Sequence, residues 1–126
     1  MATILVIDDD PMMLELYRAV LTGGGHDVVI AENGTQGLAR TDRHLDLIVV
    51  DLMMPNLNGY EFVKELRATG GHAATPVIAA SGLSTGEWAL RAGADRFLSK
   101  PFRNHELIAL VDELLGRPPK QPASAL

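Results

Sequence analysis

Three aspartates follow directly on two short apolar runs of this 126-residue chain. Asp8 and Asp9 come after the run TILVI, and Asp51 comes after the run LIVV. Carboxylates that share one edge of a fold repel each other, so stability alone does not account for such a group. Clustered oxygen ligands suit a hard divalent cation, and Mg²⁺ is the candidate. The sequence therefore predicts a magnesium site formed by these three residues.

Two further polar residues, Ser81 and Lys100, follow later apolar runs. A lysine supplies a fixed positive charge and a hydroxyl supplies a hydrogen bond, which suits a tetrahedral, multiply charged oxyanion held against a carboxylate. The chemistry that such a site favours is phosphoryl transfer, because a metal ion and a lysine neutralise oxygens that gain charge in transit. Alone, Ser81 would be an ordinary strand-end residue and Lys100 a surface lysine. Only the complete set gives them a role.

Five short strands must position these side chains. The expected strands are Thr3–Ile7, Asp27–Ala31, Leu47–Val50, Val77–Ala80 and Arg96–Leu98. Each is followed by a segment with helical spacing of apolar residues, and this alternation predicts an α/β fold with a parallel sheet covered on both faces. Ligands bind such sheets at the carboxyl ends of the strands, where the candidate residues lie.

Capping residues mark the starts of the expected helices. They are Asp10 before Pro11, Asn33 with Gln36, Asn58 with Glu61, Ser84 with Glu87, and Asn104. The second helix is expected to run to about Arg43, and the fourth is expected to be short and to end at Gly93.

The composition describes one globular domain, with 47% hydrophobic and 21% charged residues. The absence of cysteine excludes a disulfide framework, a thiol nucleophile and a cysteine-ligated metal. A net charge of −5 disfavours binding to a nucleic-acid backbone. The sequence has no apolar run of membrane-spanning length and no signal peptide, so a cytoplasmic location is expected. The histidines at positions 26, 44, 72 and 105 lack ligand spacing and are expected to be solvated.

Four motifs in order carry a resemblance to a known family. They are ILVIDDD, LIVVDLMMPNLNG, AASG and GADRFLSKPF. Together they resemble the receiver domain of two-component response regulators, of the chemotaxis-regulator type. The resemblance implies a doubly wound, flavodoxin-like sheet in the order 2-1-3-4-5. We expect a receiver domain over residues 1–116 and a flexible, proline-rich tail or linker stub over residues 117–126.

The resemblance also implies roles for the acidic residues. Asp51 is the expected phospho-acceptor. Asp9 is expected to bind Mg²⁺ directly, Asp8 through water, and the backbone carbonyl of Met53 to complete the protein ligands. The domain would then act as a switch that catalyses only its own phosphorylation and dephosphorylation, with a histidine kinase or a phosphotransfer protein as the donor.

The remaining roles concern the response to phosphorylation. Ser81 would hydrogen-bond the phosphoryl group, and Lys100 would pair with it before a cis peptide bond to Pro101. Phe97 stands where the family keeps an aromatic switch residue, although a plain core role suits it nearly as well. The stretch from Ser81 to Lys100 is roughly three residues shorter than the family pattern, about one helical turn. A shortened fourth helix is therefore expected.

Met53 and Leu83 are the positions expected to tune the lifetime of the phosphorylated state. Both are apolar, so neither can orient a hydrolytic water opposite the leaving oxygen of Asp51. Shielding by these residues predicts a comparatively long-lived phosphoryl group. The flexibility of Gly82 opposes this shielding, because it could open the site to water.

Three alternatives remain open from the residues alone. One is a phosphatase of the haloacid-dehalogenase type, one a flavodoxin-like cofactor binder, and one a receiver-like docking scaffold that is not phosphorylated. The downstream protein target, and whether the chain stands alone or belongs to a longer one, are also open. We expect no direct contact with nucleic acid or membrane, and a monomer or a weak phosphorylation-dependent dimer.

Overall fold

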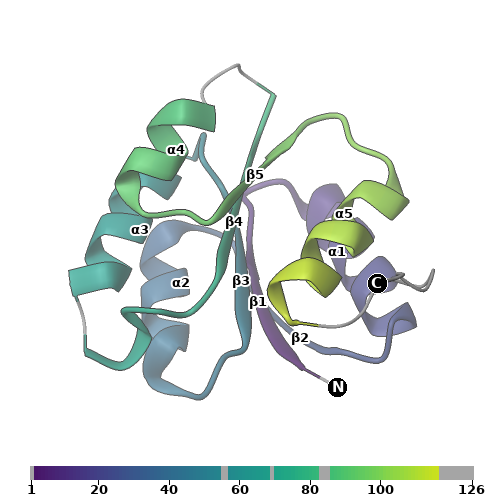
Figure 1. Cartoon of the computed structure of the whole chain (residues 1–126), viewed down its shortest axis with the longest axis horizontal. Helices are drawn as coiled ribbons and strands as arrows, with labels where there is room; N and C mark the ends of the chain where they lie inside the picture. The colour runs from purple at the N-terminus through teal and green to yellow at the C-terminus, as the bar shows by residue number, and fades with distance from the viewer. Residues whose placement is uncertain (1, 55–56, 69, 83–85, 117–126) are drawn as a thin grey trace, which may run out of the picture.

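A computed structural model describes residues 2–54, 57–68, 70–82 and 86–116. Its centre is a five-stranded parallel sheet in the order β2-β1-β3-β4-β5 (Figure 1). The strands are β1 Thr3–Ile7, β2 Asp27–Ala31, β3 Leu47–Asp51, β4 Val77–Ser81 and β5 Arg96–Ser99. The predicted α/β class, parallel sheet and strand order are confirmed, and each strand ends within one residue of its predicted end. The expected tail over residues 117–126 lies outside the described residues.

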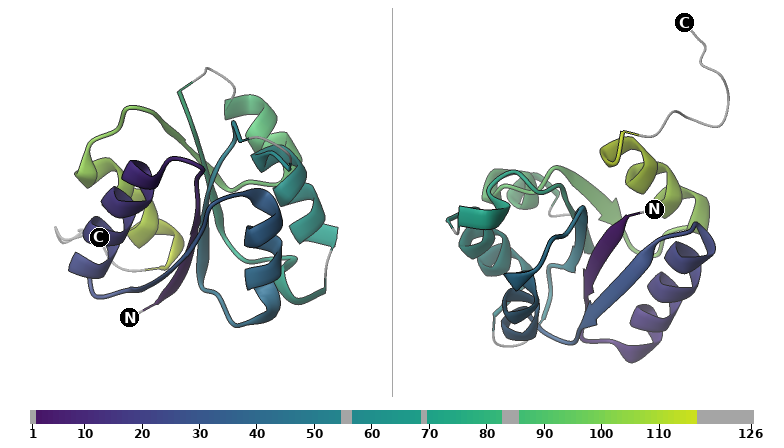
Figure 2. Two further views of the ribbon diagram at one scale, coloured as in Figure 1. Left: turned by 180° about the vertical axis from the view of Figure 1, so that it is seen from behind. Right: turned by 90° about the horizontal axis from the view of Figure 1, so that it is seen from below.

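Helices cover both faces of the sheet. They are α1 Pro11–Gly23, α2 Gly34–Ala39, α3 Gly59–Ala68, α4 Gly86–Ala92 and α5 Asn104–Leu114, with the 3-10 turns η1 Arg40–Asp42 and η2 Gly70–His72. Helices α1 and α5 lie on one face, and α2, α3 and α4 lie on the other (Figures 1 and 2). The fourth helix has seven residues, and because residues 83–85 before it lie outside the described residues, its shortening relative to the family stays a prediction. The second ends earlier than predicted and continues as η1.

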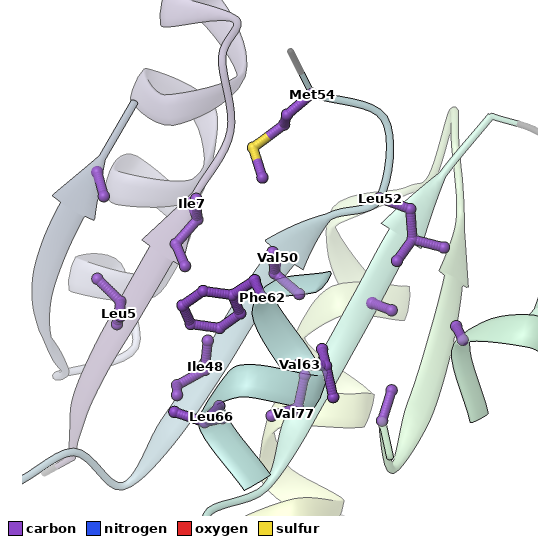
Figure 3. Close-up of a cluster of buried hydrophobic side chains, with 14 of the residues drawn as sticks. Leu5, Ile7, Ile48, Val50, Leu52, Met54, Phe62, Val63, Leu66 and Val77 are labelled. Atoms are coloured by element: carbon purple, nitrogen blue, oxygen red, sulfur yellow. The ribbon is translucent and has the colours of Figure 1, made fainter. Parts of the chain in front are cut away.

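Each buried strand contributes side chains to two hydrophobic cores, one on each face of the sheet, because successive side chains alternate between the two faces. In β1, Leu5 and Ile7 face α2 and α3, whereas Ile4 and Val6 face α1 and α5. This explains why TILVI and LIVV are continuously apolar rather than alternating. On the α2–α3 face, Phe62 lies at the centre of the cluster and is fully buried (Figure 3).

Three of the predicted helix caps are present. The Asp10 carboxylate accepts the Met12 N–H at 3.0 Å, and the Asn33 side chain accepts the Gln36 N–H at 2.8 Å. The side chain of Asn58 accepts the Glu61 N–H at 2.9 Å.

The predicted cap of the last helix is wrong by one residue. Asn104 lies inside α5, and Arg103 occupies the N-cap position. The Glu106 carboxylate accepts the Arg103 N–H at 2.7 Å, which satisfies one of the donors at the helix start without a capping side chain. The predicted cap Ser84 lies outside the described residues.

Two of the four histidines are buried, so their predicted solvation is wrong. His72 is 7% exposed, and its two ring nitrogens lie 2.9 Å from the Thr75 hydroxyl and 2.8 Å from the Thr41 carbonyl oxygen. His26 is 6% exposed, and its Nδ1 accepts the Ala2 N–H at 3.3 Å. An imidazole that is hydrogen-bonded through its ring nitrogens can be buried at little cost. The histidines at positions 44 and 105 are exposed, as predicted.

The Arg67 guanidinium ties α3 to the turns that precede β4 and β5. Its donors reach the Gly93 carbonyl at 2.8 and 3.1 Å, the His72 carbonyl at 3.1 Å and the Thr75 carbonyl at 2.6 Å. A fifth bond joins it to the Asp95 carboxylate at 3.0 Å. All five N–H donors of the guanidinium are therefore used.

We expect Arg67→Lys to lower the free energy of unfolding by about 2–3 kcal/mol, because an ammonium cannot reach these acceptors in a planar fork. Urea unfolding measures the loss. Lys64→Gln, at an exposed position of the same helix, is the matched control and should change stability by less than about 0.5 kcal/mol. Equal losses for the two variants would show that the guanidinium network contributes nothing specific.

Candidate functional site

The three predicted metal ligands meet at the carboxyl ends of β1 and β3. Asp8, Asp9 and Asp51 each offer a carboxylate oxygen, and these oxygens lie within 4.8 Å of one another. Asp8 is 1% exposed and Asp51 6% exposed, whereas Asp9 is exposed. Three carboxylates this close fit a hard divalent cation, since its charge would relieve their mutual repulsion.

Lys100 joins the two buried carboxylates. Its ammonium lies 2.9 Å from Asp8 Oδ2 and 3.5 Å from Asp51 Oδ1. Backbone donors add to this: the Asp10 N–H bonds Asp8 Oδ1 at 2.9 Å, and the Met53 N–H bonds Asp51 Oδ1 at 3.3 Å. One cation shared by two buried anions leaves the site with a net negative charge.

The pKa values of Asp51 and Lys100 reflect this imbalance. Burial, followed by the charge of Asp8, raises the pKa of Asp51, while Lys100 and the Met53 N–H act in the opposite direction. Burial opposes the charge of Lys100, but its hydrogen bond to Asp8 and the charges of both carboxylates offset this and raise its pKa. The lysine therefore stays protonated at neutral pH, and the charge of Asp51 is only partly compensated.

Strand alternation places these groups on one face of the sheet. Asp51 shares the face of Leu47 and Val49, which α1 and α5 cover. The same alternation, continued one residue beyond β1 and β5, puts Asp8 and Lys100 on that face. The sheet itself therefore directs the three charges toward each other.

Close backbone approaches fix the ends of the strands. A Cβ at Gly59 would lie 2.5 Å from the Asp51 carbonyl oxygen, so only glycine lets α3 begin against β3. The Lys100 N–H donates to the Ser81 carbonyl at 2.8 Å, which aligns the ends of β4 and β5. The Lys100–Pro101 peptide bond is cis.

The structure describes three of the four remaining predicted residues. Ser81 ends β4 and is 1% exposed. Phe97 is partly buried against the α2–α3 core, on the face opposite Asp51. Met53 is 55% exposed at the rim of the site. Leu83 lies outside the described residues.

Sequence reasoning placed Tyr17 only in the apolar stripe of the first helix. The structure brings it close enough to the site for its acidic residues to affect it: burial first, and then the charges of Asp8 and Asp51, raise the pKa of Tyr17. The only indication in the sequence was that Tyr17 carries a hydroxyl among the aliphatic residues of the buried side of the first helix. The Asp10 N–H bond to Asp8 was also missed.

Comparison with known proteins gives consistent matches. The model of the response regulator receiver domain matches residues 4–112. The chain is 37% identical over 124 residues to the DNA-binding response regulator MtrA of Mycolicibacterium smegmatis, covering 98% of this chain and 54% of the relative. It is 39% identical over 120 residues to the transcriptional regulatory protein CpxR of Escherichia coli, covering 93% and 50%. The chain thus spans about half the length of these curated relatives.

Solved structures show the same similarity. The chemotaxis protein CheY4 of Vibrio cholerae superimposes with a TM-score of 0.85 at 28% identity, covering 90% of this chain and 98% of that one. The receiver domain of the sensor histidine kinase PA1611 of Pseudomonas aeruginosa, with a magnesium ion coordinated in its active-site cleft, gives 0.85 at 29% identity, covering 91% and 98%. Within the described part of our chain, no helix has the length and apolar character that crossing a membrane requires.

Proposed function

Because the chain belongs to the response regulator receiver domain family, we propose that it is a phosphorylation-activated switch whose acceptor is Asp51. The observation that carries the proposal is the ammonium of Lys100, held 2.9 Å from Asp8 and 3.5 Å from Asp51 beside the exposed Asp9. A buried carboxylate next to a protonated lysine and two further carboxylates combines a nucleophile with the charges that phosphoryl transfer needs.

In the proposed reaction, a carboxylate oxygen of Asp51 attacks the phosphorus atom of the donor. The bond from phosphorus to the donor's imidazole nitrogen breaks as the new oxygen–phosphorus bond forms, and the donor keeps that electron pair. Lys100 turns from Asp8 to a phosphoryl oxygen, and the Ser81 hydroxyl donates to another. Lys100 thereby compensates charge that develops on the transferred group.

The proposed metal is Mg²⁺. Asp8, Asp9, Asp51 and the backbone carbonyl of Met53 would hold it, and the exposure of Asp9 leaves a route for entry from solvent. The ion would supply positive charge to the phosphoryl oxygens. The fit rests on the donor set, which consists of oxygen atoms only.

We further propose that Ser81 and Phe97 transmit the state of Asp51. They lie on neighbouring strands, since Ser81 pairs with Ser99 and Phe97 pairs with Ala79. A histidine kinase or a phosphotransfer protein is the proposed donor, and the target is a protein. A cytoplasmic location and a monomer or weak phosphorylation-dependent dimer stay predictions, as does the lack of direct nucleic-acid contact by this domain.

Incubation with acetyl phosphate, with and without Mg²⁺, tests the proposal. A switch incorporates one hydroxylamine-labile phosphate in a magnesium-dependent way, because an acyl phosphate is cleaved by that nucleophile. Turnover of a phosphate ester without stable labelling would indicate a phosphatase instead. No reaction with either compound would indicate a docking scaffold.

We expect the phosphoryl group to be long-lived, because Met53 and Leu83 cannot orient a hydrolytic water. The double variant Met53→Asn with Leu83→Glu should therefore lose phosphate several-fold faster than the wild type at the same Mg²⁺ concentration. Met12→Asn, at a methionine that is 80% exposed, is the control and should leave the rate unchanged. If the double variant decays no faster than the wild type, apolar shielding does not set the lifetime.

A further inference from the structure

The hydroxyl of Tyr17 is buried without a hydrogen-bond partner, and no other buried side-chain polar atom in the described part of the chain shares this condition. Tyr17 is 1% exposed, and its ring packs against Phe102 with centroids 5.6 Å apart. A buried donor left unpaired costs about 1–3 kcal/mol. Phenylalanine would keep the ring packing without this cost, so packing does not explain the hydroxyl.

The hydroxyl lies on the same side of the sheet as the charges of the site. Tyr17 belongs to the core between the sheet and α1 and α5, the face that carries Asp51. Helical side chains lean toward the helix N-terminus, and α1 begins only three residues after Asp8. Burial is the main cause of the raised pKa of Tyr17, and the charges of Asp8 and Asp51 raise it further, which agrees with this placement.

There is also space beside Lys100 on this side. A cavity of about 300 Å³ is lined by Met13, Leu16, Lys100, Pro101 and Phe102. The lining includes Lys100 itself, the Phe102 ring that packs against Tyr17, and Leu16, the neighbour of Tyr17 on α1. The lysine side chain therefore borders space that no side chain of the core around the phenol fills.

Movement of Lys100 would leave Asp8 Oδ2 without a hydrogen-bond donor, which the Tyr17 hydroxyl can replace. Asp8 is 1% exposed, and its Oδ2 accepts the Lys100 ammonium at 2.9 Å. When the lysine turns to a phosphoryl group on Asp51, this buried oxygen loses its hydrogen-bond donor, and a buried acceptor without a donor is costly. The Tyr17 hydroxyl is then a donor without an acceptor, and Asp8 Oδ2 is an acceptor without a donor.

We propose that Tyr17 is a positioning residue whose hydroxyl donates to the Asp8 carboxylate once Lys100 has turned to the phosphoryl group. This inference rests on the proposed function. The phenol stays protonated at working pH because its pKa is raised, so it remains a donor. The hydroxyl destabilises the free protein, in which it is unpaired, and stabilises the phosphorylated protein, in which it is paired. It therefore favours the phosphorylated form.

The test is Tyr17→Phe, with beryllofluoride and Mg²⁺ as the mimic of the phosphoryl group. In the free protein the variant should be at least as stable to urea as the wild type, because an unpaired hydroxyl is gone. Its dissociation constant for beryllofluoride, from the shift of the melting temperature with mimic concentration, should rise by roughly fivefold to tenfold. A purely structural role would move both quantities in the same unfavourable direction.

One comparison sharpens the result. Tyr60→Phe, at a partly buried tyrosine of α3, should leave the mimic affinity unchanged. A wild type that responds to the mimic while Tyr17→Phe responds equally would overturn this inference alone. A wild type that neither binds the mimic nor takes up phosphate would overturn the proposed function and this inference with it.

Discussion

Asp51→Asn is expected to reduce magnesium-dependent labelling by acetyl phosphate to background. An amide is nearly isosteric with the carboxylate but is not a nucleophile at neutral pH, so the fold stays intact while the acceptor is lost. Scintillation counting or intact-protein mass spectrometry measures the incorporation. Asp42→Asn, at an exposed aspartate of η1, is the matched control and should label like the wild type. Stoichiometric labelling of Asp51→Asn would remove the proposed acceptor.

The same variant should be more stable than the wild type at neutral pH. Burial, followed by the charge of Asp8, raises the pKa of Asp51 above its ordinary 3.8. The folded state therefore binds more protons than the unfolded state in the window above that value, and stability falls as the pH rises through it. Asparagine carries no charge, so its advantage should shrink as the pH falls toward 4. A stability difference that is independent of pH would contradict this reading of the site.

Lys100→Met is expected to lower the free energy of unfolding by about 3 kcal/mol at neutral pH, because it leaves two buried carboxylates without their shared cation. It should also abolish most of the labelling. Without the ammonium, protons bind the folded carboxylates more tightly than the unfolded ones, so the loss of stability should become smaller on acidification.

Urea unfolding at several pH values measures this effect. Lys64→Met, at an exposed position of α3, is the matched control and should have little effect at any pH. A loss below about 1 kcal/mol in Lys100→Met, or one that does not change with pH, would show that Asp8 and Asp51 do not depend on the lysine.

The parts of the fold that local patterns determine were predictable. The run LIVV is continuously apolar because both faces of β3 are covered, and this pattern alone predicted a buried strand ending at Asp51. Convergence of the strand ends on one edge then followed from the parallel sheet. The strand order itself came from the resemblance to the family rather than from periodicity.

Features that depend on distant partners were not predictable. His72 is buried because Thr41 supplies an acceptor 31 residues away, and Arg67 spans 26 residues to reach Gly93. Nothing in the local sequence of either residue indicates these partners. The missing partner of the Tyr17 hydroxyl is likewise a property of packing, since helical spacing shows only that the residue faces the core.

Asp51 is the proposed acceptor of the phosphoryl group. The most direct test of this proposal is borohydride reduction of the acetyl-phosphate-treated protein followed by peptide mass spectrometry, because reduction of an aspartyl phosphate yields homoserine at the modified position. We expect homoserine to replace Asp51 alone, and only when Mg²⁺ was present during labelling. Homoserine at Asp8 or Asp9, or an unmodified Asp51 in protein that carries labile phosphate, would contradict it.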